Sequence, residues 1–105
     1  MSPNYRVRLT QQALDDLQGI YDAIAKDSPQ NAAGMVGRIL DSIDLLEVFP
    51  HRTVVERLSA SLRYPVRSLP VKPYVIYFRV IEDERVVVIR HIRHGAREPP
   101  DTNED

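Results

Sequence analysis

The sequence of 105 residues contains no cysteine, so the chain can form neither a disulfide framework nor a thiolate metal site. It also lacks any apolar stretch near the roughly 18 residues that a membrane-spanning helix needs. The first residues, Met1 to Arg6, lack the apolar core of a signal peptide. We therefore expect an unprocessed cytoplasmic protein that makes no membrane contact.

Charge is nearly balanced over the whole chain, at −1, but it is segregated along the sequence. Residues 1–47 carry four basic and seven acidic side chains, residues 48–97 carry ten basic and four acidic, and the last eight residues carry four acidic and no basic. Of the 14 basic residues, 12 are Arg, the side chain suited to bidentate contact with carboxylates and phosphates. The +6 region implies an anionic partner, protein or nucleic acid; the alternative is a solvated sheet face whose arginines pair with nearby glutamates.

Hydrophobic periodicity predicts one domain over residues 1–98, of the α+β class, with the element order β-α-α-β-β-β. The expected elements are a strand at residues 5–9, a helix at about 11–25, a second helix from Pro29 that ends at Phe49-Pro50, an extended segment at 64–69, and strands at 74–81 and 85–93. Thr10 and Ser28 are suitable helix caps. The acidic segment 99–105 is expected to be a disordered tail.

No long crossover separates the last three extended segments, so we expect an antiparallel sheet with the helical hairpin packed on one face. The other face should be open and half-solvated. Strict alternation would place Val86, Val88, Arg90 and Ile92 on one side of the last strand. Residues 51–61 should form a loop or a short irregular strand, and residues 82–84 a three- or four-residue turn.

Several segments together resemble a known family in their order and spacing. They are Asp16-Leu17-Gln18-Gly19-Ile20, the helix end from Leu45-Leu46 to Phe49-Pro50, Val66-Arg67-Ser68-Leu69-Pro70, Tyr74-Val75-Ile76-Tyr77-Phe78-Arg79-Val80 and His94-Gly95-Ala96-Arg97. Over residues 5–98 the chain is similar to the ParE branch of the RelE/ParE toxin superfamily of bacterial toxin–antitoxin modules.

The resemblance implies a small toxin of a plasmid or chromosomal maintenance system, without a cofactor, that forms a hetero-oligomer with an antitoxin encoded beside it. ParE relatives inhibit DNA gyrase, so that cleaved DNA is not resealed. RelE relatives cut messenger RNA in the ribosomal A site, where basic side chains stabilise the developing charge and a general base activates the 2′-hydroxyl.

Three departures count against the nuclease. Val75 and Pro99 stand where RelE-type nucleases carry catalytic arginines, and no C-terminal Tyr follows. The resemblance therefore favours a topoisomerase poison that is not an enzyme and does not bind nucleic acid directly. The competing hypotheses are a RelE-like ribosome-dependent endoribonuclease and an inactive antitoxin-binding homologue. The alternative nuclease set is Arg67, Arg79, His94 and Arg97.

Candidate binding residues lie in the Arg-rich region and at the end of the second helix. Contacts with the target or the antitoxin are assigned to Arg63, Arg67, Arg79, Arg90, Arg93, His94 and Arg97, with Leu45 and Val48 in an apolar groove for an antitoxin helix. For Arg67 and Arg97 the alternative is a salt bridge to a helix carboxylate, and for His94 a hydrogen bond that stabilises the strand end. His91 and His94 should lie on opposite strand faces, which argues against a shared metal site.

Overall fold

The computed structural model describes residues 4–55 and 65–96, apart from the side chains of Arg52 and Val54. The elements are β1 (Arg6–Leu9), α1 (Gln11–Ala25), α2 (Pro29–Leu45), the 3-10 turn η1 (Pro50–Arg52), β2 (Val54–Val55), β3 (Arg67–Val71), β4 (Tyr74–Ile81) and β5 (Val86–His94). The predicted class and order are confirmed, and β2 is the short strand allowed for in the segment after α2. Arg63, Arg97 and the tail at 99–105 lie outside the described residues.

Both helices begin where the sequence places a cap. The Thr10 hydroxyl accepts a hydrogen bond from the amide of Ala13, and the Ser28 hydroxyl accepts one from Asn31, each over 3.1 Å. The helix α2 ends at Leu45, earlier than the expected Phe49-Pro50, and a turn follows it. In the described part of the chain no helix is long and apolar enough to cross a membrane.

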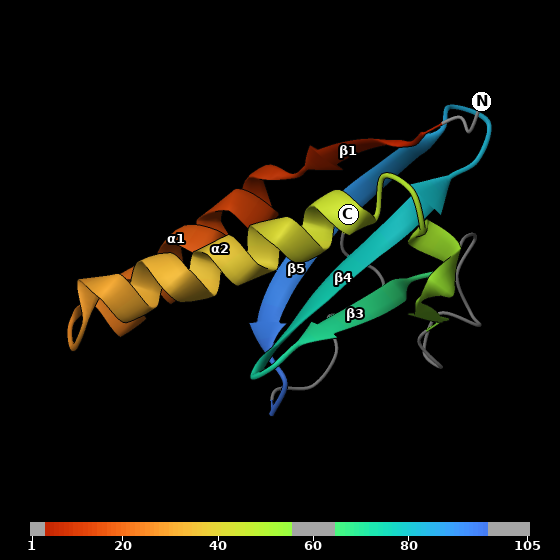
Figure 1. Cartoon of the computed structure of the whole chain (residues 1–105). Coiled ribbons are helices and arrows are strands. Elements are labelled where there is room, and N and C mark those ends of the chain that lie inside the picture. The colour runs from red at the N-terminus through yellow and green to blue at the C-terminus, as the bar shows by residue number, and fades with distance from the viewer. Residues whose placement is uncertain (1–3, 56–64, 97–105) are drawn as a thin grey trace.

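The five strands form one sheet in the order β1-β5-β4-β3-β2 (Figure 1). The strands β3, β4 and β5 form the expected antiparallel meander. β1 pairs with β5 in parallel, with Arg6 opposite Val86 and Leu9 opposite Ile89, so the sheet is mixed rather than antiparallel throughout. No tight turn joins these two strands, because the helical hairpin and the meander lie between them in the sequence. Parallel pairing is therefore open to them.

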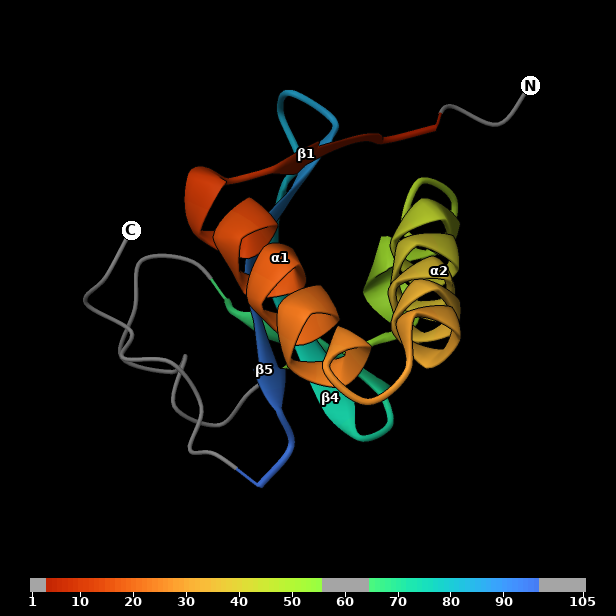
Figure 2. The ribbon, with the colours of Figure 1, turned by 90° about the vertical axis from the view of Figure 1, so that its left-hand side faces the viewer.

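The two helices lie side by side on the same face of the sheet (Figure 2). The buried stripes of the helices pack against the inward side chains of the central strands. The core formed in this way includes Leu17 and Ile20 of α1, Ile39 and Ile43 of α2, Ile76 and Phe78 of β4, and Val87 and Ile89 of β5. Burying a side chain of this size stabilises the fold by about 1.5–3 kcal/mol. The core therefore holds the helical hairpin firmly against β4 and β5.

A β-bulge interrupts the alternation of β5. Tyr77 pairs with His91, but the next residue of β4, Phe78, pairs with Ile89, so Arg90 has no opposite residue. The extra residue turns Ile92 inward, to the same core as Ile89. The expected grouping of Ile92 with Val86 and Val88 was therefore wrong.

The face of the sheet opposite the helices is not half-solvated at its centre, contrary to expectation. The side chains concerned are only 4–7% exposed: Tyr77, Val86, Val88, Arg90 and His91. Tyr77, Arg90 and His91 each also have an interaction partner. Among the described residues, large exposed apolar side chains lie on the two helices, in the turn after α2 and on β2.

Candidate functional site

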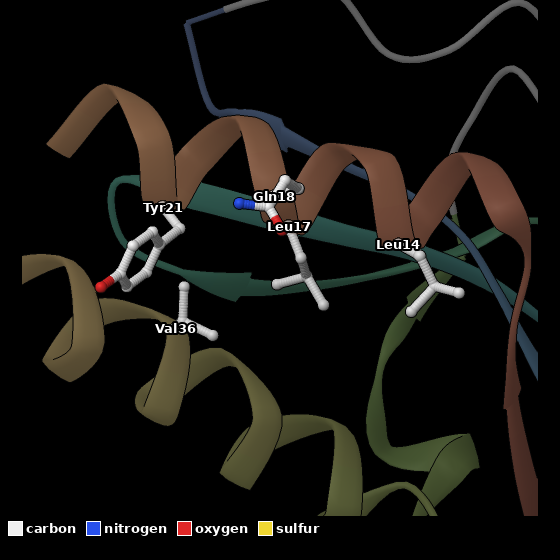
Figure 3. Close-up of a pocket in the computed structure, with 5 residues that line it drawn as sticks. All are labelled: Leu14, Leu17, Gln18, Tyr21 and Val36. Carbon is white, nitrogen blue, oxygen red and sulfur yellow. The ribbon is translucent and has the colours of Figure 1, made fainter. Parts of the chain in front are cut away.

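A groove runs between α1 and α2 on the side away from the sheet (Figure 3). Its lining residues are Leu14, Leu17, Gln18 and Tyr21 from α1 and Val36 from α2, around an open volume of about 390 Å³. The residues from α1 recur at three- and four-residue spacing, which places them on one stripe of the helix. The groove is therefore open and mostly apolar, with the amide of Gln18 and the hydroxyl of Tyr21 as the polar groups of its lining.

Large apolar side chains near this groove are exposed to an unusual degree. Leu14 is 47% exposed and Leu40, one turn after Val36 on α2, is 42% exposed. The end of α2 adds a second exposed apolar group, with Leu45 at 61% and Val48 at 45%. Leu45 and Val48 were candidate contacts of an antitoxin helix, and the structure leaves both accessible.

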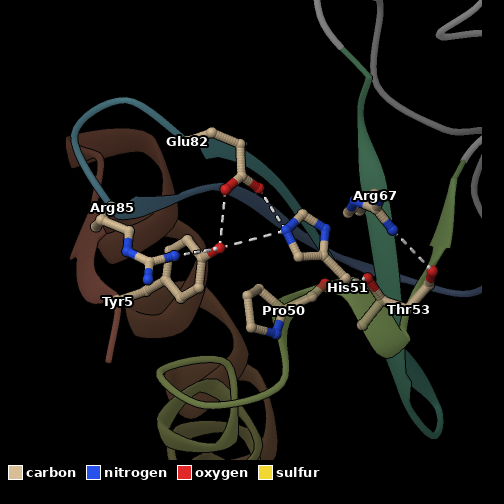
Figure 4. A network of polar contacts seen from close by, with 7 residues as sticks. All are labelled: Tyr5, Pro50, His51, Thr53, Arg67, Glu82 and Arg85. Carbon is tan, nitrogen blue, oxygen red and sulfur yellow. Dashed lines mark hydrogen bonds and ion pairs between the residues drawn. The ribbon is translucent and has the colours of Figure 1, made fainter. Parts of the chain in front are cut away.

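A network of polar contacts joins three segments that are distant in the sequence (Figure 4). The Tyr5 hydroxyl, at the start of β1, donates to Glu82 Oε1 over 2.9 Å and accepts from Arg85 Nη1 over 3.1 Å. The other carboxylate oxygen of Glu82 pairs with the imidazole of His51 in η1. The Arg85 guanidinium also stacks over the Tyr5 ring, 4.9 Å from its centroid.

The backbone of the β4–β5 turn is shaped around this network. Arg85 has a φ of 55°, a left-handed conformation that is uncommon for a residue with a side chain. The bond from Arg85 to Tyr5, together with the cation–π contact, helps to hold the turn in this conformation. The turn spans Glu82 to Arg85, which confirms the expected short loop without Gly.

The hydrogen bond from Tyr5 is the main cause that lowers the pKa of the Glu82 carboxyl below its ordinary value. Loss of water raises this pKa, and the charges of His51 and Arg85 lower it further. Glu82 is therefore a carboxylate at neutral pH. A lowered pKa makes Glu82 a weaker base, and its closest acid partner, His51, is in direct contact with it rather than across a substrate-sized space. The geometry fits a structural tie between segments better than an acid–base pair.

The described members of the alternative nuclease set, Arg67, Arg79 and His94, are not gathered at one place. Arg67 lies opposite the inward residue Phe78 and donates to the carbonyl of Thr53 over 3.1 Å. Arg79, the neighbour of Phe78 on β4, points to the other face of the sheet. His94 lies opposite Tyr74, four residues from Phe78 along β4, or about 13 Å at the usual rise of a strand.

His94 has local partners at the end of β5. Its Nδ1 accepts a hydrogen bond from the amide of Ala96 over 3.1 Å, and its ring meets Tyr74 edge to face at 5.6 Å. His91 is buried on the opposite face, as the spacing predicted. Among the described residues no group of three His, Cys, Asp or Glu side chains could hold a metal ion.

The remaining candidate arginines in the described part of the chain are at most partly accessible. Arg90 is 7% exposed at the bulge, and Arg79 is half-buried with a partner of its own. Arg93 Nη2 lies 3.5 Å from His91 Nδ1. These side chains therefore take part in the packing of the sheet in the isolated chain.

Asp16 is a structurally important residue whose contact the sequence did not reveal. Its Oδ2 accepts a hydrogen bond from the amide of Ile92 over 2.9 Å, just after the bulge and beyond the end of β1. Asp16 therefore ties α1 to the part of β5 that has no strand partner on that side. The motif Asp16-Leu17-Gln18-Gly19-Ile20 was the one sign in the sequence that Asp16 matters, but the motif does not indicate that the Ile92 amide is its hydrogen-bond partner.

Comparison with known proteins places this geometry in a family. The model of the family described as the ParE toxin of the type II toxin-antitoxin system, parDE, matches residues 7–99. The putative toxin Y4kP of Sinorhizobium fredii is 30% identical over 86 residues, which cover 82% of this chain and 86% of that protein. Both matches extend over most of the described fold.

Solved structures agree on the fold. The chromosomal ParDE system from P. aeruginosa superposes with a TM-score of 0.70 at 23% identity, over 89% of this chain and 98% of that chain. The archaeal RelE-RelB complex from Pyrococcus horikoshii OT3 gives 0.63 at 21% identity, over 93% and 100%. The RelBE2 complex from Mycobacterium tuberculosis gives 0.58 at 23%, over 92% and 98%. With the family match over almost the whole domain, the chain belongs to the ParE toxin family of type II toxin–antitoxin systems.

Proposed function

We propose that this toxin inhibits DNA gyrase and that a cognate antitoxin neutralises it by laying an amphipathic helix in the α1–α2 groove. We choose gyrase over RNA as the target because the described residues of the alternative nuclease set, Arg67, Arg79 and His94, are dispersed over the sheet. Arg67 and Arg79 point to opposite faces of the sheet, and Arg67 is committed to the carbonyl of Thr53. A phosphodiester in cleavage needs such groups around one phosphate.

The sequence supports the same choice. Val75 and Pro99 occupy positions where a nuclease of the superfamily would carry arginine. The matching family is described by its ParE toxin, whereas two of the structural relatives are RelE complexes, so the fold by itself does not separate the two activities. The proposed target therefore rests on the residues and not on the architecture.

The proposed antitoxin site rests on the exposed apolar groove. A surface on which Leu14 and Leu40 are each more than 40% exposed beside a channel lined by Leu17 and Tyr21 is typical of a protein-binding site. Two helices with a groove between them suit the helix-in-groove mode of recognition. The three structural relatives were each solved as a system of toxin and antitoxin, which supports a partner of that class.

Purified toxin tests the proposal in two parallel assays, one of gyrase supercoiling with trapped cleavage complexes and one of message cleavage during translation in vitro. The expected result is loss of supercoiling, accumulation of cleaved DNA and intact messages. Site-specific cleavage of translated messages with normal supercoiling would refute the proposal and favour the endoribonuclease. No effect in either assay would identify an inactive homologue that only binds the antitoxin.

A variant at the groove separates target from antitoxin. Because Leu14 is already 47% exposed, Leu14→Ser should leave the core intact. The variant should preserve gyrase inhibition and weaken neutralisation by the antitoxin. Val55→Ser, on β2, is the matched control, because Val55 is 45% exposed and does not line the groove. If Leu14→Ser left neutralisation intact, the antitoxin helix would have to lie elsewhere.

A further inference from the structure

We propose that the helix received by the α1–α2 groove carries Lys or Arg on both sides of its apolar stripe. This inference rests on the proposed function, because it specifies the antitoxin segment that the groove selects. It runs against the expectation from the +6 region of the sequence, which called for an acidic partner. The reason is that the accessible apolar groove and the basic region lie on different parts of the fold.

The groove sets the length and the apolar side of its occupant. Its α1 wall runs from Leu14 to Tyr21, seven residues or about 10 Å along the helix. Leu40 extends the apolar surface of α2 by one turn beyond Val36. A partner helix of three or more turns with one stripe of aliphatic residues would cover this surface.

The rim of the groove is acidic. Gln18, which lines the groove, donates to Asp22 over 2.9 Å, so this carboxylate lies next to the lining. Asp15 lies on the same side of α1, seven residues before Asp22, and is held by Gln11 over 2.9 Å. Across the groove, Asp44 follows Leu40 by one turn of α2. Three carboxylates thus border the exposed apolar surface.

Within the described residues no basic side chain forms a salt bridge with the rim carboxylates Asp15, Asp22 and Asp44. Asp15 and Asp22 each accept a hydrogen bond from a neutral glutamine amide. From residue 11 to residue 47 the chain carries seven acidic and two basic side chains, a net charge of −5. A helix with acidic flanks would bring like charges together here, whereas one with basic flanks would be attracted.

The basic strands are less suited to hold an acidic partner than their composition implies. The Arg67 guanidinium donates to the Thr53 carbonyl, Arg79 already has a partner, and Arg90 is 7% exposed. An acidic helix on these strands would have to displace existing contacts. On the described surface, the electrostatic attraction for a partner therefore acts at the helical hairpin, and it favours a basic partner rather than an acidic one.

Two designed helical peptides of about 21 residues test the inference, with the same leucine stripe and either Lys or Glu on both flanks. Fluorescence anisotropy with the complete toxin should show that the Lys peptide binds at least about tenfold more tightly at low salt, from three contacts of ordinary surface strength. This preference should shrink as sodium chloride is raised. Equal binding of both peptides, tighter binding of the Glu peptide or binding of neither would overturn the inference.

Variants locate the effect. Asp15→Asn combined with Asp22→Asn should weaken binding of the Lys peptide by about three- to tenfold and leave the thermal stability unchanged. Asp83→Asn removes an exposed carboxylate of the β4–β5 turn, outside the helical hairpin, and it should change nothing. A loss of affinity in Asp83→Asn equal to that of the double variant would show a diffuse charge effect and refute the role of the rim. Leu14→Ser should weaken both peptides.

Failure of this inference is distinguishable from failure of the proposed function. If the toxin poisons gyrase but binds the Lys and Glu peptides equally, the proposed target stands and the inference of basic flanks on the partner helix fails. If the toxin spares gyrase but prefers the Lys peptide, the proposed target fails and the inference of basic flanks stands.

Discussion

Replacement of Asp16 by alanine should lower the free energy of unfolding by about 1–2.5 kcal/mol. The substitution removes the carboxylate that accepts from the amide of Ile92 over 2.9 Å. Ile92 is 3% exposed, so its amide would lose a charged partner in a place that water reaches poorly. Such a bond contributes about 1.5–3 kcal/mol, and the better helix propensity of alanine recovers about 0.5 kcal/mol of the loss.

The neighbouring residue provides a matched control. Asp15→Ala makes the same change of charge and propensity on α1, but Asp15 is exposed and, among the described residues, accepts a hydrogen bond only from Gln11. It should change the free energy by no more than about 0.5 kcal/mol. The difference between the two variants therefore isolates the bond to the sheet from the general effects of losing an aspartate.

Urea denaturation followed by circular dichroism measures both free energies, and amide hydrogen exchange measures the Ile92 amide directly. In thermal unfolding the difference should be about 4–8 °C for each kcal/mol, given a domain of this size. Two variants within about 0.5 kcal/mol of each other, with unchanged exchange at Ile92, would refute the reasoning. Asp16→Asn should fall between the wild type and Asp16→Ala, because its amide oxygen can still accept.

Tyr5→Phe should cost about 1 kcal/mol in urea denaturation and raise the pKa of Glu82 toward its ordinary 4.5 in an NMR titration; an unmoved titration would show that the bond is absent in solution. Because folding lowers the pKa of Glu82, its stabilising effect is present above pH 4.5 and is lost as the pH falls through the folded value, so Glu82→Gln should differ from the wild type only above that range. Arg67→Met should cost about 1 kcal/mol by releasing the turn after η1; normal stability with weaker antitoxin binding would instead make Arg67 a partner contact. Gly19→Ala and Gly37→Ala should each stabilise the free toxin by about 0.5–1 kcal/mol, since no atom lies within 4 Å of an added Cβ, and only Gly37→Ala should alter antitoxin affinity if the partner helix packs over α2.

The helices could be predicted closely from the sequence because their signals are local. Thr10 and Ser28 each act on an amide three residues away, so the evidence for a helix start lies within one turn. The alternating aliphatic runs of β4 and β5 are equally local, and both strands formed where expected. Glycine inside a helix often indicates the close approach of another backbone, but nothing lies within 4 Å of a Cβ at Gly34 or Gly37.

The features that position the site depend on contacts between distant residues. The bulge at Arg90 occurs in a run without glycine or proline, so the sequence gives no sign that alternation breaks there. Tyr5 meets Glu82 across 77 residues, a separation over which periodicity carries no information. The burial of Arg90 likewise follows from the assembled sheet. Composition alone therefore overestimated how much of the positive charge is free for a partner.

The parallel pairing of β1 with β5 has a consequence for folding during synthesis. Residues Arg6 to Leu9 have no strand partner until Val86 to Ile89, 80 residues later in the sequence, have been synthesised. The helical hairpin can close early, since its two helices are adjacent in the sequence. The inward side chains of the hairpin, such as Leu17 and Ile39, nevertheless stay uncovered until the sheet has formed. Synthesis of β5 therefore completes the sheet and also covers the inner side of α1, the helix from which the groove takes most of its lining.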